Sequence, residues 1–105
     1  MSKRLAYLEK VTSEGSKDAF AWYGLAMEYG NLGRLDESVA TFEKLRALDP
    51  AYVAMYLMCG GFLIKAGKKA DGRAWLTSGI EAARKKGDSH ALSELQDALA
   101  QAGDD

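Results

Sequence analysis

The chain contains very few of the residues on which catalytic and disulfide-linked sites usually depend. Its 105 residues include one cysteine, one histidine and one proline. The lone cysteine, Cys59, excludes an internal disulfide and is typical of a reducing compartment. Any Ser–His or Cys–His pair would have to use the single histidine, His90. We therefore expect a protein without disulfides, without a catalytic site and without a cofactor.

The sequence also lacks an excess of charge and a long apolar run. It has 14 Lys and Arg against 15 Asp and Glu, a net charge of -1, whereas nucleic-acid binding usually goes with clustered cations. The longest apolar stretch, residues 55–64, is about half the length that a bilayer span needs. The first ten residues, MSKRLAYLEK, lack the apolar run of a secretory signal. These absences predict a cytoplasmic protein that binds neither nucleic acid nor membranes.

What the sequence does contain is helical apolar periodicity, clearest over residues 19–50. Its first half has apolar residues at spacings of three, four and seven, namely Trp22, Leu25, Ala26 and Tyr29. Gly33 follows, and glycine fits the left-handed position that ends many helices. The period then restarts at Leu35, Val39, Phe42, Leu45 and Leu48. Pro50 stops it. This stretch is predicted to form an antiparallel helical hairpin.

The hairpin resembles the tetratricopeptide repeat, a helix–turn–helix unit of ~34 residues. The resemblance is carried by Trp22, Leu25, Ala26, Tyr29, Gly33, Ser38, Phe42 and Pro50. Ala26 stands where the family usually has glycine, and Ser38 stands where it usually has alanine. Both residues keep the small size that close helix approach needs.

The same pattern returns one repeat length further along the chain. The signature positions are then occupied by Tyr56, Cys59, Gly60, Leu63, Gly67, Gly72 and Leu76. Each keeps the size or polarity class of its counterpart, which predicts a second repeat. Arg84 stands in place of the closing proline, so the second helix is expected to continue until Gly87 stops it.

A half-repeat is predicted at the N-terminal end of the chain. Its apolar stripe consists of Leu5, Tyr7, Leu8 and Val11, and the remaining surface is polar, as an end unit requires. Ser16 is expected to cap the helix that follows, with Lys17 and Asp18 in the first turn.

The C-terminal end is predicted to be a capping helix over residues 90–101. Leu92, Leu95 and Leu99 lie on one side of it, and Asp88 or Ser89 can cap its start. A last helix that is apolar on one face only is what the end of a helical array requires.

The predicted fold is all-α, a right-handed α-solenoid of antiparallel helical hairpins with about six helices, similar to tetratricopeptide arrays. It is expected to form a single domain over residues 1–105. The expected parts are a half-repeat over 1–16, a first repeat over 17–52, a second repeat over 53–87 and a capping helix over 88–102.

The first helix of each predicted repeat, called the leading helix, has a second apolar stripe, which marks the candidate binding surface. One stripe per helix packs against its neighbours, whereas a second stripe is either also buried or available to a partner. In tetratricopeptide arrays the leading helices line a concave groove, so the resemblance implies that this stripe lines it. Asn31 and Lys65 are the polar candidates beside it. The predicted partner-binding residues are Phe20, Tyr23, Met27, Asn31, Leu57, Ile64 and Lys65, and Ala54 and Gly61 continue the stripe.

The predicted partner is another protein or peptide with an apolar or amphipathic segment. Two alternatives stay open: the chain itself covers the stripe, or a second copy does so in a homodimer. Some tetratricopeptide proteins hold a partner's terminal carboxylate with Lys and Asn on these faces. Here Tyr23, Met27 and Leu57 stand there instead, which argues against a carboxylate-ended partner.

Two further groups of polar residues have an ordinary structural explanation as well as a functional one. Lys65, Lys68, Lys69 and Arg73 cluster near the second turn, where they either steer an acidic partner or serve as solvated helix ends. His90, Glu94 and Asp97 share one helix face, but no further ligand is evident and a solvated capping helix has the same pattern. We therefore expect no metal site.

Overall fold

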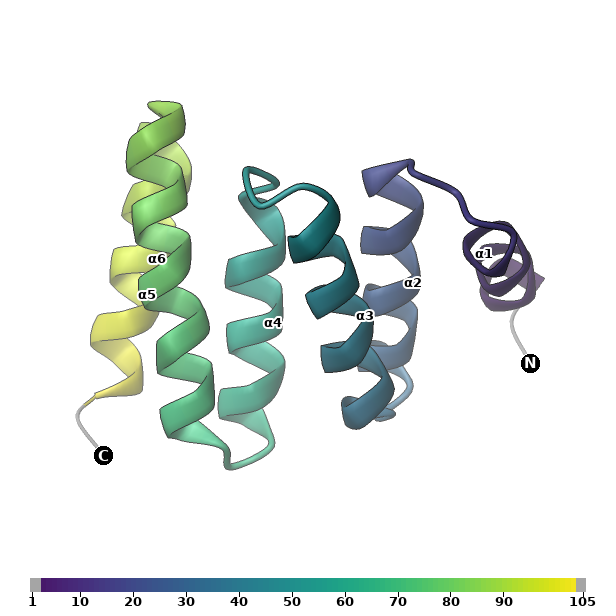
Figure 1. The fold of residues 1–105 in the computed structure, drawn as a ribbon. Coiled ribbons are helices and arrows are strands. Elements are labelled where there is room, and N and C mark those ends of the chain that lie inside the picture. Colours follow the sequence, from purple (N-terminus) through teal and green to yellow (C-terminus); the bar gives the residue numbers. More distant parts are fainter. Residues whose placement is uncertain (1–2, 104–105) are drawn as a thin grey trace. The chain divides into compact units, whose positions relative to one another are not determined.

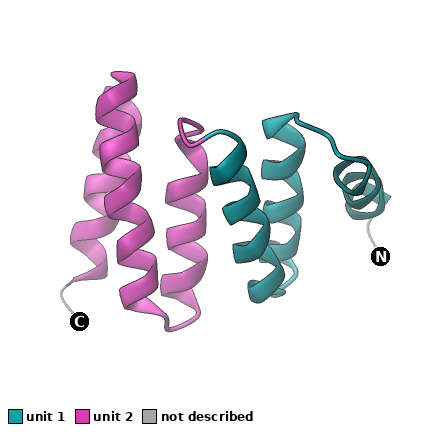
Figure 2. Cartoon of the chain, viewed as in Figure 1, with its two compact units in different colours: residues 1–49 teal, residues 50–105 magenta. Residues whose placement is uncertain are grey.

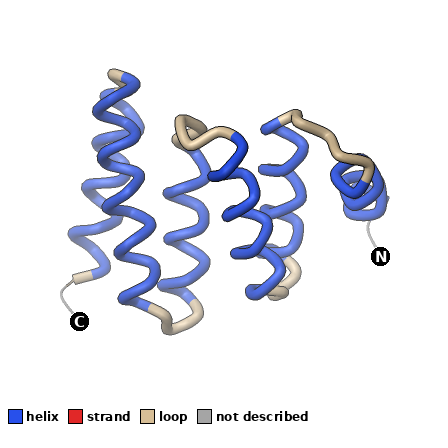
Figure 3. The backbone as a smooth tube through the Cα atoms, viewed as in Figure 1, coloured by secondary structure: helices blue, strands red, loops and turns tan. Residues whose placement is uncertain are grey.

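The computed structural model describes residues 3–103, and all regular structure in that range is helical (Figure 3). It contains α1 (Lys3–Ser13), α2 (Ala19–Asn31), α3 (Leu35–Leu48), α4 (Ala54–Lys65), α5 (Lys69–Lys86) and α6 (Ser89–Ala102), as Figure 1 shows. The predicted all-α architecture of about six helices is therefore confirmed.

The helices fall into two compact units, residues 1–49 and residues 50–105 (Figure 2). The first unit holds α1, α2 and α3, and the second holds α4, α5 and α6. The repeat boundaries expected from the sequence stay predictions.

In the first unit, α2 and α3 form the hairpin that the periodicity predicts (Figure 1). Gly33 lies between them with φ of 78°, a left-handed conformation that costs glycine little. Ala26 and Ser38 are fully buried, and the Ser38 hydroxyl donates to the Ala26 carbonyl at 2.8 Å. The small residues thus allow close approach of the two helices. The buried hydroxyl is hydrogen-bonded, so its burial does not leave an unsatisfied polar group.

Helix α1 crosses α2 steeply. Figure 1 shows α1 almost along its axis and α2 from the side. Leu5 and Leu8 of α1 pack in one cluster with Leu25 and Tyr29 of α2. The predicted stripe on α1 is only partly correct, since Tyr7 is 65% exposed. The crossing places Tyr7 outside the cluster that buries the two leucines.

A chain of polar contacts around Tyr29 connects α1 to α3. The Tyr29 hydroxyl donates to the Glu9 carboxylate at 2.6 Å, and the Arg34 guanidinium lies 4.7 Å from the centre of the Tyr29 ring. Arg34 in turn donates twice to Glu37, at 2.6 and 2.7 Å. Burial, followed by the hydrogen bond to Glu9 and the negative charge of Glu9, raises the pKa of Tyr29 to about 12.

The cap of α2 differs from the prediction. The Asp18 carboxylate, not Ser16, accepts the amide of Phe20 at 3.0 Å, because the helix begins at Ala19 and residue 18 is its cap. Ser16 instead stabilises the segment before the helix. Its hydroxyl accepts a hydrogen bond from the amide of Asp18, and its carbonyl accepts one from the indole N–H of Trp22 at 2.7 Å.

In the second unit, glycines set the spacing between helices. A Cβ on Gly79 of α5 would lie 2.5 Å from the Cβ of Tyr56 and 2.8 Å from a methyl of Leu95. Contacts that short do not occur between real side chains, so only glycine allows α4 and α6 to come this close to α5. Helix α5 ends at Gly87, with φ of 75°, as the missing proline predicts.

Helix α6 is capped at its start and bound to α5 at its end. Of the two predicted caps Asp88 is used, since its carboxylate accepts the amide of Ala91 at 3.0 Å. At the other end the Arg73 guanidinium donates to the carbonyls of Leu99 and Gly103. Leu95 is fully buried between these two points. A cation from α5 thus serves the unpaired carbonyls at the C-terminal end of α6.

Two glycine-to-alanine substitutions test the packing of the second unit. Gly79→Ala should lower the free energy of unfolding by about 1–3 kcal/mol, because the added methyl meets Tyr56 and Leu95. Gly61→Ala is the matched control in α4, where a Cβ meets nothing within 4 Å, and it should raise the free energy by about 0.5–1 kcal/mol. Urea unfolding followed by circular dichroism measures both. A change in the free energy of unfolding that has the same sign for both variants would contradict the packing described.

The raised pKa of Tyr29 predicts a loss of stability at alkaline pH. The unfolded chain releases the phenol proton near pH 10, the ordinary value, and the folded chain does so only near pH 12. The stabilisation is therefore complete below pH 10 and is lost as the pH rises toward 12. Tyr29→Phe should cost about 1 kcal/mol at neutral pH and should flatten this decline.

Urea unfolding at a series of pH values measures the effect of Tyr29→Phe, with Tyr7→Phe as the control. Tyr7 is largely exposed, so its substitution should leave the free energy of unfolding at neutral pH unchanged. An identical alkaline decline in the Tyr29 variant and the unsubstituted protein would refute the assignment.

Candidate functional site

The predicted binding residues of α2 lie along one side of that helix. Phe20 is 65% exposed, Asn31 is exposed, and Tyr23 and Met27 are half-buried. The Tyr23 ring also meets the Phe42 ring of α3 edge-on, with centroids 6.5 Å apart. Burial raises the pKa of Tyr23. Tyr23 therefore belongs partly to the hairpin core, and Phe20 and Met27 offer the apolar surface beyond it.

The predicted binding residues of α4 differ in how far the hairpin already uses them. Leu57 and Ile64 are half-buried, and Lys65 is exposed. Ile64 lies over the backbone of α5, since a Cβ on Gly72 would be 2.5 Å from its side chain. Gly61, by contrast, has open space where a side chain would be. Gly61 is thus a position at which this side of α4 is open.

The cationic cluster near the α4–α5 turn is not uniform. Lys65 and Lys68 are exposed and Lys69 is half-buried, but Arg73 is turned to the end of α6, where it donates to two carbonyls. Arg73 therefore has a structural role, and the three lysines remain as the positive charge of this turn.

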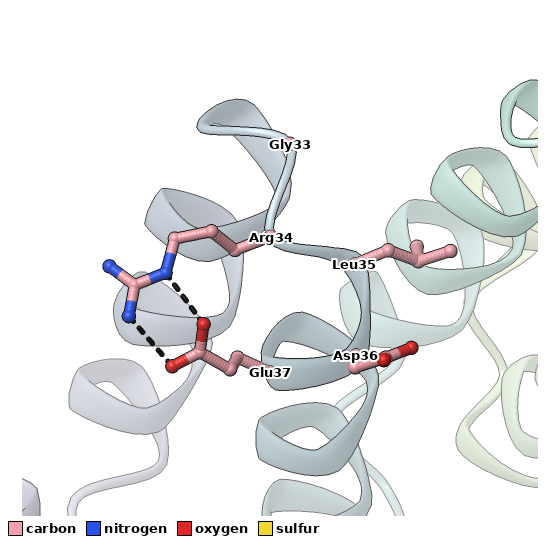
Figure 4. A pocket seen from close by; sticks show the side chains of 5 residues that line it. All are labelled: Gly33, Arg34, Leu35, Asp36 and Glu37. Atoms are coloured by element: carbon pink, nitrogen blue, oxygen red, sulfur yellow. Dashed lines mark hydrogen bonds and ion pairs between the residues drawn. The ribbon is translucent and has the colours of Figure 1, made fainter.

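A shallow hollow at the start of α3 has a volume of about 320 Å³ (Figure 4). Gly33, Arg34, Leu35, Asp36 and Glu37 line it. Figure 4 shows Arg34 and Glu37 directed at each other, which neutralises both charges. The hollow has no nucleophile and no general base other than carboxylates, so nothing in it resembles a catalytic arrangement.

A second hollow, of about 380 Å³, lies between α1 and α2 and is called the α1–α2 hollow below. Its lining residues are Arg4, Tyr7, Leu8, Val11, Ser16, Asp18, Phe20 and Ala21. This hollow was not predicted from the sequence, because Tyr7 was assigned to the core stripe of α1 and Phe20 to the groove. The signal that points to it is the set of side chains near Tyr7, which are mostly cationic.

The remaining polar groups do not form a reactive site. Cys59 is a fully buried thiol outside any disulfide, and its burial was predicted. His90 is largely exposed and lies 3.6 Å from Glu94. Within residues 3–103, no three His, Cys, Asp or Glu side chains are grouped so that they could hold a metal ion. In the same range no helix has the length and apolar character that a membrane span requires.

Comparisons with known proteins agree with this architecture. The tetratricopeptide repeat family model matches residues 21–52. A tetratricopeptide repeat domain protein from Salinibacter ruber, solved in solution, is 36% identical, with a TM-score of 0.76 over 82% of this chain and 87% of that one. A crystal structure from the same organism gives 36% identity and a TM-score of 0.72 over 81% and 94%.

A solution structure of a protein from Bordetella parapertussis has a TM-score of 0.82 over 97% of this chain and 89% of that one. At 24% identity it supports the fold alone. Comparison with proteins of curated function gives no match.

Tetratricopeptide repeat domains in general are modules of protein–protein interaction and are typically not catalytic. The hairpin of α2 and α3 matches the family model, and a domain of the same family aligns with most of the chain at 36% identity. The chain therefore belongs to the tetratricopeptide repeat family and has its all-α helical repeat fold.

Proposed function

We propose that this protein is an interaction module that binds an apolar or amphipathic polypeptide segment through its leading helices, α2 and α4. The residues concerned, together called the leading-helix stripe, are Phe20, Tyr23, Met27 and Asn31 on α2 of the first unit and Leu57, Ile64 and Lys65 on α4 of the second unit. It performs no chemistry and needs no cofactor. The chain has a single cysteine, the buried Cys59, and therefore no internal disulfide, which supports a reducing, cytoplasmic setting.

The observation that carries the proposal is the lack of charge on the leading helices. A surface helix ordinarily has a charged outer face. Helix α2 has a single charged residue in 13, Glu28, which pairs with Arg4 at 3.2 Å. Helix α4 has a single one in 12, Lys65 in its last turn. Both helices bury one side in their own unit and retain apolar side chains on the other.

The trailing helices provide the comparison. In α3 the outer face carries Asp36, Glu37, Glu43, Lys44 and Arg46, all of them exposed. In α5, Asp71, Glu81, Arg84, Lys85 and Lys86 are likewise exposed. The hairpins thus separate a charged outer face on the trailing helix from an apolar one on the leading helix, and the apolar face is the one suited to a partner.

The mechanism is burial of a partner's apolar side chains, with polar contacts at the helix ends. Met27 and the half-buried Met58 have flexible, polarisable side chains that adapt to different partners. Asn31 and Lys65 lie at the C-terminal ends of α2 and α4, where they can bind a partner's backbone or an acidic group. Neither nucleic acid nor a membrane surface is the expected partner.

A double charge substitution tests the stripe. Met27→Glu combined with Leu57→Glu should weaken by about tenfold or more the binding of peptides selected from a displayed random library against the unsubstituted protein. The matched control is Ala40→Glu with Ala74→Glu, at exposed positions of α3 and α5, which should bind the peptides normally. Fluorescence anisotropy measures the affinities. Equal binding to both double variants would rule out the stripe as the binding surface.

The competing role of the same stripe, a homodimer interface, is tested by the solution mass. Light scattering over a wide range of protein concentration should give the monomer mass throughout for a module that binds foreign segments. A doubled mass that reverts to the monomer in the Met27→Glu, Leu57→Glu variant, but not in the Ala40→Glu, Ala74→Glu control, would instead assign the stripe to self-association.

A further inference from the structure

The α1–α2 hollow has an unusual concentration of exposed aromatic surface. Among the large apolar side chains described by the structure, Tyr7 and Phe20 are the most exposed, at 65% each. Both line this one hollow, from different helices. The proposed function makes use of Phe20 alone and leaves Tyr7 and the hollow without a role. Exposed aromatic rings that gather at one concave place are typical of a binding surface.

The shape of the hollow suits the insertion of a partner's side chain. Leu8, Val11 and Ala21 provide apolar lining, and Leu8 is itself buried in the contact with α2. The volume of about 380 Å³ exceeds what one large side chain fills and lies at the lower end of the range for small-molecule sites. The rings of Tyr7 and Phe20 offer their faces and edges to an aromatic or aliphatic group.

The charges around Tyr7 all have one sign. Residues three and four positions away on the same helix are its neighbours in space. For Tyr7 these are Lys3, Arg4, Lys10 and Val11, so three are cations and none is a carboxylate. Lys3, Arg4 and Lys10 are exposed. Lys17, just before the start of α2, is exposed as well.

The carboxylates of this region are engaged within the unit. Asp18 accepts the amide of Phe20 at 3.0 Å, Glu28 pairs with Arg4 at 3.2 Å, and Glu9 accepts the Tyr29 hydroxyl at 2.6 Å. Glu14 is exposed beyond the end of α1. The charged residues that line the hollow itself are Arg4 and Asp18, and Lys3 and Lys10 lie beside Tyr7 at its edge. The Arg4 guanidinium has five N–H donors, so its pairing with Glu28 leaves donors for a second carboxylate.

We propose that the α1–α2 hollow binds an acidic polypeptide segment, which inserts an aromatic or large aliphatic side chain between Tyr7 and Phe20 and places its carboxylates at Lys3, Arg4, Lys10 and Lys17. The apolar insertion supplies affinity, and the cations supply selection for acidic partners. This surface shares Phe20 with the leading-helix stripe, but Tyr7 and the cations of α1 take no part in that stripe.

A second copy of the chain fits the hollow less well. The most acidic of its helices, α6, carries Glu94 and Asp97 and no Lys or Arg. Its leucines, however, face its own unit: Leu95 is fully buried, and Leu92 and Leu99 are half-buried. That helix therefore offers carboxylates without a side chain free to enter the hollow.

Three capped peptides that differ only in charge test the proposal. The acidic probe is Asp-Glu-Leu-Trp-Glu-Asp, its neutral match is Asn-Gln-Leu-Trp-Gln-Asn, and the basic version has lysine at the four outer positions. Each is titrated into the nitrogen-15-labelled full chain, and amide shifts are followed by NMR. The acidic probe should shift amides within residues 4–21 and bind about tenfold or more tightly than the neutral probe. Its affinity should fall as salt is added.

Variants separate this surface from the stripe. Tyr7→Ser should weaken the binding of the acidic probe by about tenfold. Lys3→Gln with Lys10→Gln should remove most of the salt dependence of that binding. Leu32→Ser, at another exposed apolar residue, is the matched control and should bind normally. The Met27→Glu, Leu57→Glu variant should also bind normally, so loss of the stripe's function leaves this test unaffected.

Several results would overturn the proposal. Equal affinity for the acidic and neutral probes, shifts confined to residues outside 4–21, or unchanged binding by Tyr7→Ser would each do so. Tighter binding of a hexaproline peptide would assign the hollow to proline-rich segments instead. Self-association that rises with protein concentration and is lost in Tyr7→Ser would assign it to a second copy.

Discussion

The structure depends on a very close approach of the two helices within each hairpin. In the first hairpin the contact is made by Ala26 and Ser38, which are both fully buried. The second hairpin has Gly60 and Gly72 one repeat length further on, where a Cβ on Gly72 would lie 2.8 Å from the Gly60 carbonyl. Because these positions carry so little volume, larger neighbours such as Phe42 and Leu76 fill the surrounding space completely. In the first hairpin Ser38 adds a hydrogen bond to Ala26. In the second, the absence of a side chain at Gly72 allows its backbone to lie close to Gly60.

This close packing determines which surfaces remain for other molecules. Each hairpin buries one side of its leading helix. No charged residues cover the opposite side of α2 or α4. The first unit has an additional surface, since α1 crosses α2 and leaves Tyr7 and Phe20 at the edge of a hollow. One chain thus carries two apolar surfaces of different character. The leading-helix stripe has few charges, whereas the α1–α2 hollow is bordered by cations.

Local features of the sequence predicted much of this architecture. Gly33, Gly67 and Gly87 indicated the ends of three helices, and all three have positive φ. The burial of Cys59 followed from its place in the repeat. The features that were missed depend on packing between helices. Ser16 and Asp18 are equally good caps by residue type, and only the helix start decides between them. The exposure of Tyr7 depends on the crossing of α1, and the position of Ile64 depends on the missing side chain of Gly72. The partner-binding residues themselves stay predictions.

The attachment of α1 has a consequence for the energetics of the first unit. Leu5 and Leu8 pack α1 against α2, and two polar contacts join the helices, one from Tyr29 to Glu9 and one from Arg4 to Glu28. A terminal helix held by so few groups opens locally at a lower free energy than the hairpin beside it. The α1–α2 hollow exists only while α1 is docked. Any molecule bound there shifts the opening equilibrium toward the docked state by mass action, so occupancy of the hollow would slow amide hydrogen exchange throughout α1.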